Sequence, residues 1–241
     1  MKLFDATLFS FLLLTCFGNL TLAEEEKSKV TQSIAILYFE NNNEDDKELQ
    51  RLSKGLCSMM IEHFQDTSEM KVIERARIQS ILSELEMTRG PQFDQATVAK
   101  IGKLVGAEYL VFGSYFEIFK KFTISARIVK VETGVIVAAA GVSGKADSFD
   151  TLQKNLSNEL LTKISGVKKV NSKHLARKEG QAELVASKVS VSNVAKYGDA
   201  LDLFDKGEKP GARKILMDIV EANPDFSVAK TMLETMASKS N

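Results

Sequence analysis

The sequence is poor in the residues that build reactive or cross-linked sites. Among 241 residues there are two cysteines, two histidines, three prolines and no tryptophan. Cys16 lies in the N-terminal leader described below, so a chain cleaved after this leader keeps only Cys57 and forms no internal disulfide. One cysteine and two distant histidines, His63 and His174, also do not supply the ligands of a zinc cluster. The composition therefore excludes the disulfide-rich and zinc-ribbon classes of protein.

The sequence also lacks an excess of either charge. Lys and Arg total 32, Asp and Glu total 32, and the formal net charge is +0. A dedicated nucleic-acid-binding domain usually has a basic excess, so nucleic acid is not the expected partner. Beyond the N-terminus, no segment approaches the ~20 consecutive apolar residues that a membrane-spanning helix requires.

What the N-terminus does have is the layout of an export signal, predicted for residues 1–23. Lys2 precedes an apolar run over residues 8–17, and the small residues Thr21 and Ala23 precede three glutamates. A charged start, a short apolar run and a small-residue cleavage site are typical of a secretory signal peptide.

A second interpretation of the leader concerns Cys16. The stretch Leu13-Leu14-Thr15-Cys16 resembles a bacterial lipobox, in which the cysteine is lipid-modified, although Thr15 departs from the usual Gly, Ala or Ser. Two alternatives stay open: cleavage after Ala23, or lipidation of Cys16. Both predict a protein of the periplasm or of the periplasmic face of the outer membrane, with any membrane attachment made through the lipid anchor.

The first half of the exported chain alternates strand and helix patterns. The nearly all-apolar stretch 34–39 predicts a strand buried on both faces, and 40–46 reads as a polar loop. Apolar residues at three-to-four spacing predict helices over 47–65 and 75–86, with a short strand over 70–73 between them. A third helix is predicted after Asp94, which serves as its N-cap. Gly106 ends the third helix, so Gly102 and Gly106 serve packing and capping rather than phosphate binding.

Three strand patterns follow, over residues 108–119, 122–131 and 135–142. Glu132-Thr133-Gly134 predicts a tight turn in which Gly134 supplies a positive φ. The turn at residues 119–122 has no Gly or Asn, so we expect a longer or irregular loop there. The three strands predict an antiparallel meander, and a helix pattern from Ser148 to Gly166 follows it.

These patterns predict an α/β (α+β) layered domain over residues 31–166, built on a mixed sheet that ends in the meander. Residues 167–192 carry an excess of Lys and Arg and predict a basic linker. Residues 193–241 resume helical periodicity and, with small residues at a helix crossing and Pro224 after the second helix, predict a tetratricopeptide-like helix hairpin. A single hairpin does not bury its apolar face alone, so we expect it to dock on the main domain or on a partner.

Three stretches together resemble the CsgG-like family, the fold of the curli secretion-channel lipoprotein. They are Val72-Ile73-Glu74-Arg75, the stretch from Lys100 to Ser114, and Arg127-Ile-Val-Lys-Val-Glu-Thr-Gly134. The resemblance covers about residues 33–164. Its relatives by fold include the TolB N-terminal domain and lipoprotein activators of penicillin-binding proteins.

The resemblance implies a non-enzymatic cell-envelope assembly protein that binds other envelope proteins, with homo-oligomers among its states. The alternative is a subunit of an oligomeric outer-membrane secretion channel of the curli type. The channel inserts long amphipathic hairpins, and this sequence has no alternating segments to spare beyond its core strands, which disfavours the alternative.

No cofactor, metal ligand or catalytic residue is predicted. Catalysis needs convergent acid, base or nucleophile groups, and the carboxylates Glu74, Glu108, Glu117 and Glu132 follow no catalytic motif. The predicted contact surfaces are instead the edge of the meander and the C-terminal helices, because exposed strand edges and single helical repeats both seek partners.

Overall fold

The computed structural model describes residues 32–43, 45–67, 70–85, 95–165 and 189–238, all within one compact unit, Thr31–Asn241. The predicted signal peptide, the Asp94 cap, Gly166, His174 and most of the predicted linker lie outside the described residues. Within the described part, no helix is both long enough and apolar enough to cross a membrane.

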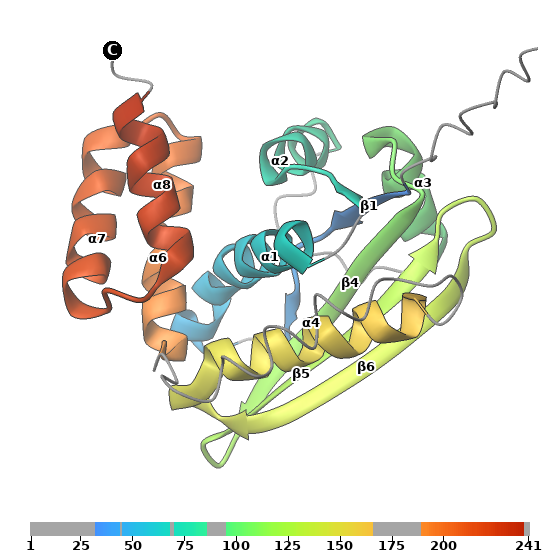
Figure 1. The fold of residues 1–241 in the computed structure, drawn as a ribbon, viewed down its shortest axis with the longest axis horizontal. Coiled ribbons are helices and arrows are strands. Elements are labelled where there is room, and N and C mark those ends of the chain that lie inside the picture. Colours follow the sequence, from blue (N-terminus) through green and yellow to red (C-terminus); the bar gives the residue numbers. More distant parts are fainter. Residues whose placement is uncertain (1–31, 44, 68–69, 86–94, 166–188, 239–241) are drawn as a thin grey trace, which may run out of the picture. The chain divides into compact units, whose positions relative to one another are not determined.

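The architecture is a six-stranded mixed sheet with helices on both faces, which confirms the predicted fold class (Figure 1). The strand order is β3-β1-β4-β5-β6, and β2 pairs separately with β4. The strands are β1 (Ser33–Ile36), β2 (Glu40–Asn41), β3 (Lys71–Val72), β4 (Tyr109–Ile118), β5 (Lys121–Lys130) and β6 (Val135–Lys145). The helices are α1 (Lys47–Thr67), α2 (Arg75–Glu84), α3 (Gln95–Val105), α4 (Phe149–Ser165), α6 (Val191–Asp205), α7 (Lys209–Ala222) and α8 (Ser227–Ser238), with a 3-10 turn at Ala146–Ser148.

The strand β1 lies in the middle of the molecule because its side chains are apolar in both directions. Ile34 and Ile36 pack with α1 and α4 in the larger core cluster, while Ala35 and Leu37 pack with α2 and α3 in the smaller one. β1 pairs in parallel with both β3 and β4, as the βαβ-like order of the first half requires. The structure confirms the predicted strand buried on both faces, but this strand spans Ser33–Ile36 rather than residues 34–39.

The meander of β4, β5 and β6 is antiparallel, as predicted, and alternates cleanly between faces. Along β5, Phe122, Ile124 and Ala126 are buried beneath the helices, while Ser125 and Arg127 on the other face are exposed. The helices α2 and α3 cover this second face near β1, the start of β4 and the end of β5, where Val129 and Val131 belong to their core cluster. No other helix of the described part of the chain belongs to the core cluster on this second face.

Two turns of the meander illustrate what glycine does and does not decide. Gly134 has φ +68, as the tight turn after β5 predicts, and Gly106 has φ +74 where it ends α3. At the other turn the prediction of a longer loop is wrong. Ile118 pairs directly with Lys121, so Phe119 and Lys120 alone make the turn, with φ +50 and +61.

Three further predictions need correction. The stretch 40–46 is not wholly a loop, because Glu40 and Asn41 form β2 and pair with Ser114 and Tyr115. The last strand of the meander runs to Lys145 rather than ending at residue 142. The C-terminal segment holds a third helix, α8, beyond the predicted hairpin of α6 and α7.

Candidate functional site

The strand β6 forms one edge of the sheet, since it pairs with β5 and with no other strand of the described part of the chain. From Val135 to Gly144 it contains no charged residue, and Lys145 ends it. Natural edge strands are usually short, charged or interrupted, because an unpaired strand invites another strand to add to it. This edge, predicted as a contact surface, is eleven residues long and almost uncharged.

One side chain reaches the free side of β6 from the neighbouring helix. Lys163 Nζ, on α4, donates hydrogen bonds to Ala139 O at 2.5 Å and to Glu159 Oε1 at 2.7 Å. The carbonyl of Ala139 therefore points away from β5, and the edge offers at least one acceptor to a group outside the sheet.

The outward direction of the Ala139 carbonyl fixes the direction of the backbone groups of every second residue along β6. The pairing of β6 with β5 is regular from Ala139 to Lys145, with the register shift lying before it. In a regular antiparallel strand, every second residue directs both N–H and C=O to the same side. Gly141 and Ser143 therefore also direct their backbone groups outward. Both residues are exposed, and the missing side chain of Gly141 and the small one of Ser143 leave room for an added strand.

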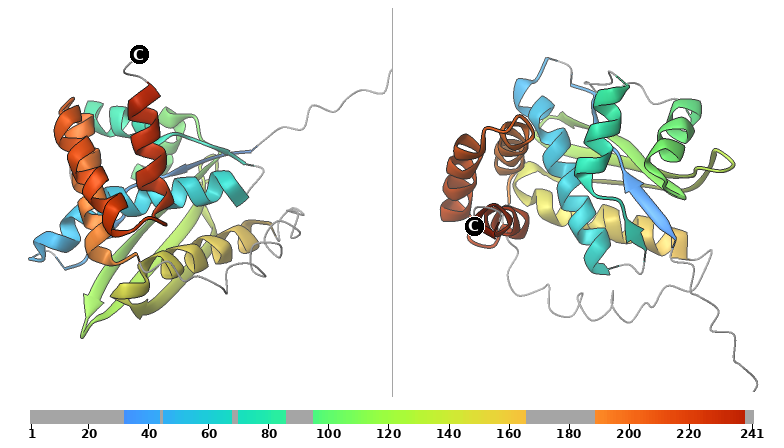
Figure 2. Two further views of the ribbon diagram at one scale, coloured as in Figure 1. Left: turned by 60° about the vertical axis from the view of Figure 1, so that its left-hand side comes forward. Right: turned by 90° about the horizontal axis from the view of Figure 1, so that it is seen from above.

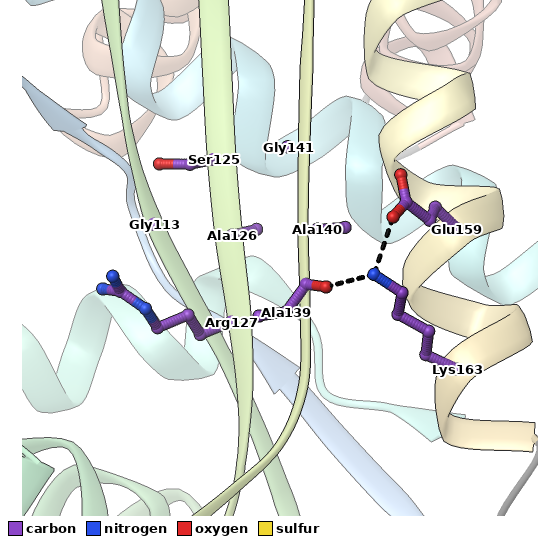
Figure 3. Close-up of a pocket in the computed structure, with 9 residues that line it drawn as sticks. All are labelled: Gly113, Ser125, Ala126, Arg127, Ala139, Ala140, Gly141, Glu159 and Lys163. Atoms are coloured by element: carbon purple, nitrogen blue, oxygen red, sulfur yellow. Dashed lines mark hydrogen bonds and ion pairs between the residues drawn. The ribbon is translucent and has the colours of Figure 1, made fainter.

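A shallow hollow of about 290 Å³ lies at this edge (Figure 3). Figure 3 shows Lys163 and Glu159 beside Ala139, with Arg127 extending from the opposite side of the strands. The residues that line the hollow are Gly113, Ser125, Ala126, Arg127, Ala139, Ala140, Gly141, Glu159 and Lys163. Most of them are small, and Glu159 is already paired with Lys163. The hollow suits a backbone better than a reacting substrate.

The C-terminal helices, the second predicted contact surface, dock on α1 (Figure 2). Gly198 on α6 lies against Arg51 of α1, where an added Cβ would meet Arg51 O at 2.0 Å. Gly55 on α1 lies equally close to Val194 of α6, with a Cβ-to-O distance of 2.4 Å. Two glycines thus bring the helix backbones into close approach.

Acidic residues of α6 face basic residues of α1 and α2 across this contact. Asp199 accepts from Arg51 at 2.6 Å, and Lys54 bonds both Asp202 and Asp205. Arg75, at the start of α2, makes two hydrogen bonds of 2.8 Å to Asp205. The spacing of the three aspartates is readable in the sequence, but their partners lie 130 to 151 residues away in the chain, so sequence reasoning missed the contact.

The pKa values at this contact follow from burial and pairing. Burial alone would raise the pKa of Asp205, but the hydrogen bonds and charge of Arg75, with Lys54, outweigh it and lower that pKa. Burial raises the pKa of Asp199, and Arg51 offsets only part of this effect. Arg75 also approaches Tyr38 Oη at 3.5 Å, and burial raises the pKa of the Tyr38 hydroxyl.

The predicted site residues are not drawn together. Cys57 is fully buried, its Sγ lies 3.2 Å from Ile36 O, and burial raises its pKa to about 12, so it is a packed and unreactive thiol. His63 is half-buried, and its Nε2 is hydrogen-bonded to Asn158 Oδ1 at 2.8 Å. Cys16 and His174 lie outside the described residues.

The four carboxylates considered for catalysis also stand apart. Glu74 precedes α2, Glu108 precedes β4, Glu117 lies within β4 and Glu132 sits in the turn after β5. Glu132 pairs with Lys130 at 3.3 Å, and Glu108 accepts from Gln32 at 3.2 Å. Within the described ranges no three His, Cys, Asp or Glu side chains gather as metal ligands.

Comparison with known proteins gives a family-model match over the first part of the chain. The family model of the curli production assembly/transport component CsgG matches residues 18–117. The match includes Val72-Ile73-Glu74-Arg75 and the stretch from Lys100 to Ser114, whereas residues 118–164 lie beyond it. A search of curated proteins finds no significant match.

Solved structures give more distant likenesses. Lipoprotein GNA1162 from Neisseria meningitidis is 15% identical, with 64% of this chain and 99% of that chain covered and a TM-score of 0.41. The LpoB C-terminal domain from Salmonella enterica is 13% identical, with 49% and 87% covered and a TM-score of 0.37. TolB from Acinetobacter baumannii is also 13% identical, with 56% and 29% covered and a TM-score of 0.35.

The family match itself supports a cell-envelope protein with an interaction role. Over residues 18–117 the chain matches the CsgG family, and the resemblance predicted from the sequence is thereby confirmed.

Proposed function

We propose that this protein is a non-enzymatic assembly protein of the cell envelope, exported to the periplasm or the periplasmic face of the outer membrane. It binds other envelope proteins by accepting an extended segment at the edge of β6. The single observation that carries the proposal is this long, uncharged edge, with outward backbone groups at Ala139, Gly141 and Ser143.

Strand addition supplies affinity through main-chain hydrogen bonds and needs few specific side chains. Lys163 donates a hydrogen bond to the Ala139 carbonyl. Because its side chain is 45% exposed, this bond can be exchanged for a bond to water at a small cost in free energy. Lys163 protects the edge from indiscriminate pairing while no partner is present, as lysines on edge strands commonly do.

The test is capture of partners from envelope extract by the wild-type chain and by Gly141→Pro. Proline removes one outward N–H without breaking a bond to β5, so the variant stays folded and loses edge-dependent partners. Leu104→Lys, on the exposed part of α3, is the matched control and keeps them. Circular dichroism verifies that both variants fold.

Light scattering of the same three proteins separates the outcomes. An association between copies that Gly141→Pro abolishes assigns the edge to a homo-oligomer, and a ring with conductance in planar bilayers would favour the channel alternative. A monodisperse monomer that captures the same proteins whether or not the edge is intact contradicts the proposal.

A further inference from the structure

The hairpin between β4 and β5 ends in an unusually exposed apolar tip. Phe119 is 99% exposed and Ile118 is 54% exposed. Both turn residues, Phe119 and Lys120, have a positive φ, a backbone conformation that residues other than Gly and Asn seldom adopt. A bulky residue kept in such a position without packing indicates a role outside the fold.

The base of this hairpin is held firmly, so the tip projects in a defined direction. Asn43 accepts a hydrogen bond from Glu117 N at 2.8 Å and donates one to Glu117 O at 3.1 Å. Just inside the tip, the Phe122 ring stacks on Tyr115 at 5.8 Å and meets Phe149 edge-on at 5.3 Å. These contacts fix both strands up to Glu117 and Phe122 and leave only the tip without cover.

Positive charge surrounds the tip. Lys120 is exposed in the turn, Lys121 is exposed at the start of β5, and Lys121 pairs across the sheet with exposed Lys145. The nearest acidic residues along the chain are Glu117, which is half-buried, and Asp147. Three exposed lysines thus flank one exposed aromatic ring.

A protein partner is a poor match for this shape. A stable protein interface buries about 800 Å² on each side, whereas a phenylalanine offers about 150–250 Å². A bilayer surface accepts a convex apolar side chain whatever its outline, and anionic headgroups attract lysines beside it.

We propose that the tip formed by Ile118, Phe119, Lys120 and Lys121 is a membrane-contact site for an anionic bilayer. Phe119 and Ile118 enter the interfacial region, and the lysines, with Lys145, lie on the lipid headgroups. This extends the sequence prediction, in which any membrane attachment comes through a lipid anchor alone. It does not depend on the β6 edge, so either proposal can fail without the other.

The absence of tryptophan makes a local test direct. In Phe119→Trp the only tryptophan reports the environment of the tip, whatever the N-terminus does. Vesicles of phosphatidylglycerol and phosphatidylethanolamine shift its emission to shorter wavelength, and phosphatidylcholine vesicles shift it less. Met217→Trp, at an exposed position on α7, is the control and does not shift.

Flotation with the anionic vesicles measures the contribution of each group. Phe119→Gly lowers the partition coefficient by roughly tenfold to a hundredfold, the effect of one apolar side chain leaving the bilayer. Glycine accepts the positive φ, so this variant loses binding while its unfolding midpoint stays level or rises. The double variant Lys120→Gln, Lys121→Gln binds the vesicles less tightly, and its binding depends less on salt concentration. The control Lys214→Gln, on α7, changes neither the binding nor its dependence on salt.

Three outcomes overturn the proposal. The first is a Phe119→Trp emission that no vesicle changes. The second is an equal shift in Met217→Trp, which would mean general adsorption. The third is a shift caused by lipid-free envelope protein but not by vesicles, which would assign the tip to a protein partner.

Discussion

At the scale of single residues, Arg75 shows how one position links the family motif to the rest of the molecule. It closes the stretch Val72-Ile73-Glu74-Arg75, and in the structure it pairs with Asp205 at the end of α6. The sequence predicts the helix α2, but it does not predict that Arg75, the first residue of α2, forms an ion pair with the C-terminal helices. The reason is that an ion pair depends on how two distant helices are placed, which local pattern does not encode.

The lowered pKa of Asp205 predicts a pH dependence of stability. A carboxyl whose pKa is lower in the folded than in the unfolded chain stabilises the fold above its unfolded pKa, with a reference value of 3.8. This contribution is lost as the pH falls through the folded pKa. Asp205→Asn should therefore be less stable than wild type near neutral pH and should lose less stability on acidification below about pH 4.

Urea unfolding monitored by circular dichroism at several pH values measures this difference. Asp218→Asn, at an exposed position on α7, controls for the removal of a surface charge and should follow the wild type. A pH profile of Asp205→Asn parallel to that of the wild type would show that the pair with Arg75 adds nothing to stability.

At the scale of elements, the crossing of α1 and α6 is determined by two glycines that the sequence marks only as small residues. Gly55 and Gly198 each stand where a Cβ would overlap the backbone of the other helix. The predicted hairpin carries a small-residue crossing, but which helix it meets follows from tertiary packing.

Gly198→Ala should destabilise the protein by about 1–3 kcal/mol, the usual cost of adding atoms to a close-packed contact. In an ordinary helix interior the same change stabilises by about 1 kcal/mol, so the sign of the effect is diagnostic. Urea unfolding measures it. Gly141→Ala is the control, because the nearest atom to its Cβ is 3.7 Å away. A Gly198→Ala variant as stable as wild type would argue against the close crossing.

The β4–β5 and β5–β6 turns differ in whether their sequences predict them. Gly134 signals its tight turn from sequence, because glycine enters positive φ without strain. Phe119 and Lys120 make a still tighter turn without that signal: two residues join the paired Ile118 and Lys121, whereas four residues join the paired Lys130 and Val135. Local preference predicted a loop there, and strand pairing overrode it.

At the scale of the whole molecule, the α/β domain and the C-terminal helices share one core. Residues of α6, α7 and α8 belong to the same buried cluster as β1, α1 and α4. The sequence predicts a separate helical segment after a basic linker, which must dock on the main domain or on a partner. In the structure this segment docks on α1 of the same chain. We therefore expect one cooperative unfolding transition rather than two.

Single tryptophans at buried aromatic positions, Phe122→Trp in β5 and Phe226→Trp just before α8, report the sheet and the C-terminal helices respectively. Their urea transitions should have the same midpoint, and far-UV circular dichroism should agree with both. Two separated midpoints would mean that the helices open while the sheet stays folded, and would make them an independent unit.

Much of the molecule was predictable because its signals are local. The doubly apolar β1, the alternating β5, the glycines that end α3 and the β5–β6 turn, and the order of elements all follow from side-chain periodicity and backbone preference. These patterns, with the three motif stretches, also pointed to the family. By itself, then, the amino-acid order determined the layered class and the order of its elements.

Tertiary structure alone decided the surfaces that carry the proposals. Whether β6 keeps a free edge depends on where the last strand joins the sheet, and whether Phe119 is exposed depends on which helices stop short of the tip. Which lysine reaches the Ala139 carbonyl, and which arginine meets Asp205, depend on the placement of distant elements. Such properties arise from the relative positions of elements, and no window of sequence contains them.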